Sequence, residues 1–105
     1  MKPKITADQA AQMLNATEPF WLNGGGEIHS LSELAQAQLA KETFAHHVSK
    51  EKNDFAAWIK GCVRDEALAA AVAKVKSPGT LQKKVAARVA ELQKIAYGKG
   101  TAAKA

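Results

Sequence analysis

The sequence predicts a mainly α protein: a small helical bundle with a short N-terminal hairpin or extended arm and a long C-terminal helix. Twenty-two of the 105 residues are alanine, the strongest helix former, whereas only six are aromatic. Apolar residues recur at helical spacing in several segments, and most of these segments begin at a residue that caps helices well. The length is that of one domain, which we place at residues 1–98, followed by a disordered basic tail at 99–105.

The first helix is expected between Ile5 and Leu14. Thr6 followed by Gln9 is a capping-box pattern, in which each side chain bonds the backbone N–H of the other residue at the helix start. We expect Pro19 to end this helix, because the residue before a proline is kept out of helical geometry.

Two short strands or extended arms are expected next, around a tight turn. The apolar run at 20–22 and residues 27–29 flank Asn23 and three glycines, which favour such a turn. A hairpin this small is marginally stable in water, so we expect it to lie against the helices. Of the two tryptophans, Trp21 on this hairpin is expected to be exposed and Trp58 to be buried.

Two short helices are predicted after the hairpin. The first begins at Ser30, with Glu33 reaching back in a second capping box. Its apolar positions are Leu31, Leu34, Ala35 and Leu39. The second short helix carries Phe44 and Val48.

Two further helices follow. Asn53 or Asp54 caps the first, which presents apolar residues at i, i+3, i+4, i+7 and i+8, a pattern typical of a buried stripe. These residues are Phe55, Trp58, Ile59, Cys62 and Val63. Asp65 or Glu66 begins the next helix, whose inner positions are Leu68, Ala71, Val72 and Val75.

The last helix is expected from Thr80 to about Tyr97, after a break at Ser77-Pro78-Gly79. Its apolar side consists of Leu81, Val85, Val89, Leu92 and Ala96. Together the helices predict a core built around Phe44, Phe55, Trp58, Ile59, Leu68 and Leu92.

The cellular compartment follows from what the sequence lacks. A single cysteine, Cys62, cannot form an internal disulfide and suits a reducing compartment. The charged residues at 1–4 are not followed by an apolar signal core. The longest apolar run, at 67–73, is far shorter than the ~20 residues that cross a bilayer. We therefore expect a cytoplasmic protein with no membrane partner.

Positive charge is concentrated in the C-terminal third. Residues 1–73 hold seven Lys or Arg against nine Asp or Glu, whereas residues 74–105 hold eight against Glu91 alone, which gives net charges of −2 and +7. Such an asymmetry favours an acidic protein surface or nucleic acid, although basic faces also occur on proteins that bind nothing anionic. The residues expected to make these contacts are Lys76, Lys83, Lys84, Arg88 and Lys94.

The histidines His29, His46 and His47 are weak candidates for a metal site. Adjacent histidines on a helix point about 100° apart, so His47 would pair more naturally with Glu51 at i+4. The alternative is that one of the two adjacent histidines hydrogen-bonds within the fold while the other is solvated. We expect no bound metal and no other cofactor, because the usual ligand spacing is missing.

No complete catalytic arrangement is visible, and we expect no enzyme activity. Cys62 falls on the predicted buried stripe, which favours an inert thiol over a nucleophile. Asp54 and Asp65 both stand where helices begin, so we expect caps instead of an acid–base pair. The glycines at 24–26 do not match the spacing of phosphate-binding loops and are expected to form a hairpin tip.

A further pattern extends from residue 20 to residue 75. It consists of FWL at 20–22, SLSEL at 30–34, Phe44 with the adjacent histidines, NDFAAWI at 53–59 and DEALA at 65–69. In these segments the chain resembles a prokaryotic family of domains of unknown function with the pattern His-His…Asn-Asp-Phe-x-x-Trp-Ile…Asp-Glu-x-Leu-Ala. The resemblance implies a small, mainly helical cytoplasmic module and brings no established activity, substrate or catalytic residue. The residues from Pro78 onward lie outside it.

These observations favour a noncatalytic interaction or regulatory module that presents a basic C-terminal helix to an acidic partner, expected to be a protein. One alternative is sequence-nonspecific nucleic-acid binding, with the same basic residues on phosphates. A second alternative is weak metal binding. The last helix is also long and alanine-rich, so pairing with a second copy of the chain stays open.

Overall fold

The computed structural model describes residues 5–97. Its elements, in chain order, are α1 (Ala7–Met13), β1 (Asn15–Trp21), β2 (Glu27–Ser30), α2 (Leu31–Gln36), α3 (Lys41–His47), α4 (Asp54–Trp58), the π-helical turn η1 (Ile59–Val63), α5 (Glu66–Val72) and α6 (Pro78–Tyr97). The predicted mainly helical chain with a hairpin and a long last helix is confirmed, although the hairpin makes it more than a helical bundle. The tail predicted at 99–105 lies outside the described residues. Across residues 5–97, no helix combines the length and apolarity of a membrane span.

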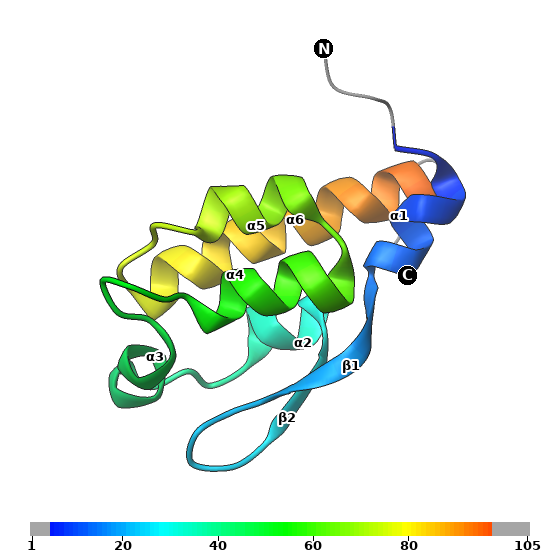
Figure 1. Ribbon diagram of the computed structural model, residues 1–105. Coiled ribbons are helices and arrows are strands. Elements are labelled where there is room, and N and C mark those ends of the chain that lie inside the picture. The colour runs from blue at the N-terminus through cyan, green and yellow to red at the C-terminus, as the bar shows by residue number, and fades with distance from the viewer. Residues whose placement is uncertain (1–4, 98–105) are drawn as a thin grey trace.

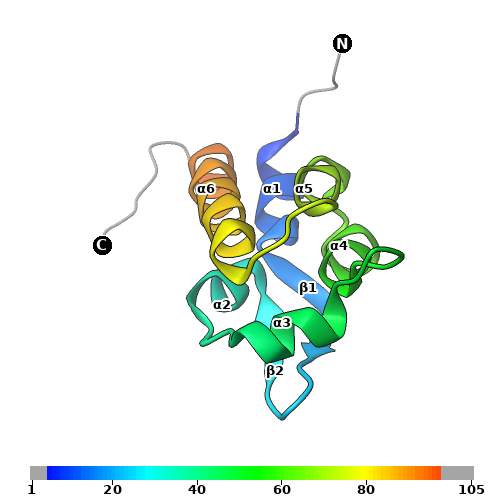
Figure 2. The ribbon, with the colours of Figure 1, turned by 90° about the vertical axis from the view of Figure 1, so that its left-hand side faces the viewer.

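Helix α6 is the central support of the molecule, because α1, α2 and α5 all pack against it. Figure 1 shows α6 behind α5, with the segment formed by α4 and η1 in front. In Figure 2, α6 and α2 lie on one side, α4 and α5 lie on the other, and the hairpin extends below α3. The two strands pair antiparallel, Phe20 with Ile28 and Trp21 with Glu27.

The apolar core lies between these elements. All six residues expected at its centre are buried: Phe44, Phe55, Trp58, Ile59, Leu68 and Leu92. Helix α6 buries the predicted positions Leu81, Val85, Val89 and Leu92. Phe55 joins the helices to the hairpin, since its ring stacks on Phe20 with centroids 4.7 Å apart and on Phe44 with centroids 6.0 Å apart. Burial of such a side chain contributes about 1.5–3 kcal/mol.

The first strand fastens the hairpin to the core. Phe20 is buried, and the Trp58 Nε1–H donates to the backbone carbonyl of Glu18 at 2.8 Å. Trp21 is 66% exposed, so the predicted contrast between the two tryptophans is confirmed. The three glycines at 24–26 have φ between +97° and +115°, values that glycine adopts without strain. The predicted tight turn therefore exists.

The prediction that Pro19 ends the first helix is wrong. Helix α1 begins with the expected capping box of Thr6 and Gln9 but ends at Met13. Pro19 lies inside β1, a strand of a two-stranded sheet in which every strand is an edge. A residue without an N–H is tolerated at a sheet edge, and the extended backbone before it is what proline favours.

The capping box predicted at Ser30 is modified by the hairpin. Ser30 Oγ accepts the Glu33 N–H at 3.1 Å, but the Glu33 carboxylate accepts the N–H of His29 instead of that of Ser30, at 2.6 Å. Helix α2 follows β2 without a loop, which brings the His29 N–H within reach. This backbone hydrogen bond lowers the pKa of Glu33 and satisfies a strand donor that would otherwise be open to another chain.

Asn53 is the cap of α4, one of the two residues predicted, and it also joins two helices. Its Oδ1 accepts the Ala56 N–H at 3.0 Å. Its Nδ2 donates to the carbonyl oxygens of Val72 and Ala73, at 2.9 and 3.2 Å. One side chain therefore begins α4 and satisfies the end of α5.

Helix α6 begins at Pro78, two residues earlier than predicted. Ser77 Oγ accepts the N–H of Thr80 at 3.2 Å. Proline suits the first position of a helix, since its missing N–H would have no helical partner there. One turn later, Gln82 Nε2 donates to the carbonyl oxygens of Leu34 and Ala37 and so connects α6 with the end of α2.

We expect Asn53→Ala to lower the free energy of unfolding by about 2–3 kcal/mol, because it removes a cap and leaves two carbonyl groups without their donor. Ser30→Ala, which removes one cap only, should cost about 1 kcal/mol. Urea unfolding followed by circular dichroism measures both values. Equal losses would contradict the joining role of Asn53.

Candidate functional site

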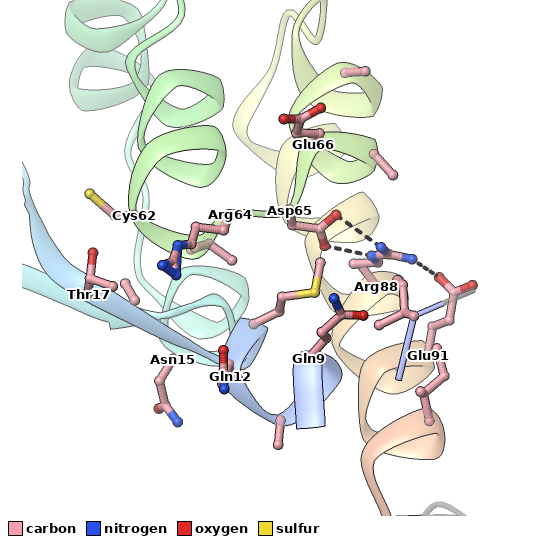
Figure 3. Close-up of a pocket in the computed structure, with 18 residues that line it drawn as sticks. Gln9, Gln12, Asn15, Thr17, Cys62, Arg64, Asp65, Glu66, Arg88 and Glu91 are labelled. Atoms are coloured by element: carbon pink, nitrogen blue, oxygen red, sulfur yellow. Dashed lines mark hydrogen bonds and ion pairs between the residues drawn. The ribbon is translucent and has the colours of Figure 1, made fainter. Parts of the chain in front are cut away.

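An open groove with a volume of about 1440 Å³ crosses one side of the protein. Helix α1 and the start of β1 form one wall, η1 and the start of α5 form the other, and α6 contributes from Arg88 onward. Figure 3 shows Gln12, Asn15 and Thr17 on the first wall and Arg64 on the second. The groove combines apolar and polar side chains, and its lining includes the ion pair of Asp65 and Arg88.

The end of η1 shapes this second wall. After α4 the helix widens into η1, and the Asp65 N–H returns to the carbonyl oxygen of Ile59 at 3.2 Å. Arg64 has φ +67°, the only positive φ of a non-glycine residue within the described part of the chain. This left-handed conformation costs an L-residue about 1–2 kcal/mol. It reverses the chain after η1, so that Asp65 points into the interior.

Asp65 is completely buried and holds α5 to α6. Its Oδ2 accepts from Arg88 Nε at 2.7 Å, and its Oδ1 accepts from Arg88 Nη2 at 3.0 Å, the two-point pairing that suits a guanidinium. The same Oδ1 accepts the Leu68 N–H at 3.0 Å, which confirms the prediction that Asp65 caps a helix. Arg88 Nη1 also donates to Glu91 at 2.9 Å.

Arg88 does not belong to an open basic face, contrary to the prediction. Only 12% of its side chain is exposed. The hydrogen bonds with Asp65 raise the pKa of Arg88 and, with help from Glu91, outweigh the opposing effect of burial. A guanidinium that already binds two carboxylates has little capacity left for a partner. The prediction placed Arg88 away from the apolar side of the helix, but Arg88 lies three residues after Val85 and four before Leu92, on the buried side of α6. The buried acid that α5 places opposite it could not be found from helical spacing.

The other four predicted binding residues form what we call the lysine surface: Lys76, Lys83, Lys84 and Lys94. All four are exposed. The ion pairs found among residues 5–97 involve none of them. Lys83 and Lys94 are eleven residues apart, so they lie on one side of α6 at a separation of about 16 Å, and Lys84 lies about 100° further round.

His47 is buried between the hairpin and α4. Its Nε2 accepts the backbone N–H of Asn23 at 3.0 Å, and its Nδ1 lies 3.0 Å from Asp54 Oδ2. Since Nε2 accepts, the ring proton must be on Nδ1, which donates to the carboxylate. His46, by contrast, is exposed. The alternative of one hydrogen-bonded and one solvated histidine is therefore confirmed.

The histidines do not converge on a common site. His29 lies on the surface between Glu27 and Glu33, at 3.0 and 3.2 Å. His47 pairs with Asp54, not with Glu51, because the chain folds back after α3: Val48 bridges to Asn53. No three His, Cys, Asp or Glu side chains are grouped to hold a metal ion in the portion of the chain that is described.

Asp54 is not the cap that its position suggests. It lies in the first turn of α4 and binds the side chains of His47 and Lys52, the latter at 3.2 Å. Desolvation opposes ionisation of this carboxyl group, but the hydrogen bonds from His47 and Lys52 together outweigh it and lower the pKa of Asp54. Asp54 therefore acts as the anionic partner of the His47 imidazole.

Cys62 is half-buried, in contrast to the fully buried neighbours on its predicted stripe. It packs against the core and also lines the groove. The widening of η1 explains the difference, because a π-helical turn rotates later residues away from the face that α-helical spacing predicts.

Comparisons with protein-family models, with curated proteins and with solved structures found no match to this chain. The resemblance of residues 20–75 to a prokaryotic domain family therefore stays a prediction.

We expect Asp65→Asn to lower the free energy of unfolding by about 3 kcal/mol. Asparagine can still cap α5, so the loss isolates the charge left on the mostly buried Arg88. Glu91→Gln removes the exposed ion pair between Arg88 and Glu91 and should lower the free energy of unfolding by less than about 1 kcal/mol. Chemical denaturation of both variants gives the comparison, and similar losses would show that burial of the pair is unimportant.

Stability should depend on the ionisation of Asp54. Because the pKa of this group is lowered in the folded protein, the carboxylate stabilises the fold above its ordinary pKa, about 3.9, and this contribution is lost as the pH falls through the folded value. The difference in unfolding free energy between wild type and Asp54→Asn should therefore shrink as the pH is lowered from about 5 to about 2. Urea unfolding at several pH values measures it, and a constant difference would contradict the ionic role.

Proposed function

We propose that this protein is a noncatalytic interaction or regulatory module whose lysine surface binds an acidic protein. The observation that carries the proposal is the separation of two kinds of cation in the C-terminal part of the chain. Arg88 is mostly buried and pairs with the buried Asp65 and the exposed Glu91, whereas Lys76, Lys83, Lys84 and Lys94 are exposed and lack an ion-pair partner among residues 5–97. Their charge is available to another molecule.

The engagement of the interior titratable groups supports a noncatalytic role. A general base needs a lone pair that can reach a substrate proton. Both nitrogens of His47 have partners, and both oxygens of Asp65 accept hydrogen bonds from Arg88. The hydrogen-bonding groups of these side chains are therefore used within the fold and are not available to a substrate.

Charge also bears on which partner is favoured. Two copies that met through the middle of α6 would bring lysines against lysines: Lys83 opposite Lys94 in an antiparallel pair, and each opposite itself in a parallel pair. Like charges at such contacts oppose association. An acidic surface with carboxylates about 16 Å apart would match Lys83 and Lys94 without this penalty.

Nucleic acid is the competing partner, because phosphates also present a row of negative charges. If the three lysines of α6 contact phosphates of duplex DNA, log affinity should fall with log salt with a slope of about −2.7. Arg88 is not counted among these contacts, because its guanidinium already pairs with Asp65 and Glu91.

The test compares two triple variants with equal changes in net charge. Lys83→Glu, Lys84→Glu and Lys94→Glu together remove the α6 part of the lysine surface. Lys41→Glu, Lys50→Glu and Lys60→Glu reverse three exposed lysines elsewhere and serve as the matched control. Binding to polyglutamate and to a 20-base-pair duplex is measured by fluorescence anisotropy over a range of salt concentrations.

We expect the α6 variant to bind polyglutamate at least about tenfold more weakly, while the control loses less than about threefold. Equal losses in both variants would show a general effect of net charge and would refute the proposal. Tighter binding to the duplex than to polyglutamate, with the salt slope given above, would identify nucleic acid as the partner and would refute the proposal of an acidic protein.

A further inference from the structure

We propose that His47 is a pH-sensitive latch, which holds the tip of the hairpin against α3 when it is neutral and releases the tip when it is protonated. The latch is the hydrogen bond from the Asn23 N–H to His47 Nε2, at 3.0 Å. Asn23 is the first residue of the hairpin turn and His47 is the last residue of α3, so this bond joins two segments that are 24 residues apart in sequence.

The local geometry allows only one tautomer of the neutral ring. The backbone N–H of Asn23 can only donate, so it requires an unprotonated Nε2. Ionised Asp54 can only accept, so it requires a proton on Nδ1. Both requirements are met by the neutral Nδ1–H ring. Protonation would place an N–H on Nε2, directly facing the N–H of Asn23, and two donors cannot share a hydrogen bond.

The ring cannot easily avoid this conflict by turning. Only 9% of the His47 side chain is exposed. Phe20 and Phe55 pack against it in T-shaped arrangements, with ring centroids 4.8 and 5.4 Å away. A ring flip would also carry Nδ1 away from Asp54. The mobile partner is therefore the hairpin tip, where glycines 24–26 supply three successive flexible positions.

The charged and titratable groups around His47 are Asp54, Lys52 and His46. Asp54 faces Nδ1 and attracts a positive ring, and Lys52 contacts the same carboxylate and weakens that attraction. His46 is the adjacent ring, 5.0 Å away by centroid, and β1 faces His47 with the uncharged Phe20. Asp54 thus holds the imidazolium in place after protonation. The bond that breaks is the one to Asn23 at the hairpin tip, and the contact between His47 and Asp54 stays.

Opening of the latch would change the position of the hairpin itself. This opening would move the strand that carries Trp21, which is 66% exposed and lies two residues before Asn23. The device therefore acts on the hairpin surface, and it is independent of the lysine surface on α6.

Nuclear magnetic resonance tests the latch on the intact wild-type chain. The protonation of His47 is followed through its ring nitrogen shifts, and the protection factor of the Asn23 amide is measured by hydrogen exchange at each pH. We expect protection at Asn23 to fall about tenfold as His47 becomes protonated, the equivalent of one lost hydrogen bond. Constant protection across that titration would refute the latch.

Three variants sharpen the test. His47→Gln offers an amide oxygen near the position of Nε2 and cannot titrate, so Asn23 should stay protected as the pH falls. His46→Gln is the matched control on the neighbouring exposed position and should keep the wild-type response. Asp54→Asn removes the anion that stabilises the imidazolium, so opening should move to lower pH. An unshifted transition in Asp54→Asn, or a wild-type transition in His47→Gln, would contradict the mechanism.

Discussion

The buried ion pair between Asp65 and Arg88 fixes how the helices pack against one another. It connects the start of α5 to the middle of α6 and ends the wide turn of η1 in one defined orientation. A desolvated carboxylate is costly unless its oxygens are satisfied, and here a guanidinium and a helix N–H satisfy them. Both residues of the pair also line the groove. The left-handed Arg64 is the local strain that this arrangement requires.

Around that pair, side-chain to backbone hydrogen bonds compensate for the shortness of the helices. Helices α2 and α4 have six and five residues, far below the length at which an isolated helix is stable. Asn53 closes the end of α5, Gln82 closes the end of α2, and Trp58 bonds to the first strand. Each bond joins elements distant in sequence. The fold is therefore cooperative, because no short helix can persist without its neighbour.

The polar chemistry of the protein is divided between its interior and its surface. Inside, Arg88 and His47 each have their hydrogen-bonding capacity taken up by partners on other elements. Outside, the lysine surface carries charge without a partner among the described residues. This division favours function by surface contact. The proposed His47 latch adds a control of the hairpin, since the bond to Nε2 exists only while this nitrogen is unprotonated.

Local sequence patterns were sufficient to predict the helical class, the hairpin, the buried apolar residues of α6 and several caps, because these depend on residues three or four apart. Thr6 with Gln9 and the apolar spacing of α6 are of this local kind. Three features depend on the packing of the whole chain: the pairing of Arg88 with Asp65, the pairing of His47 with Asp54 and the position of Pro19 in a strand. Spacing gives the direction in which a side chain points, but the group that it meets belongs to another element, placed there by the packing of the whole chain.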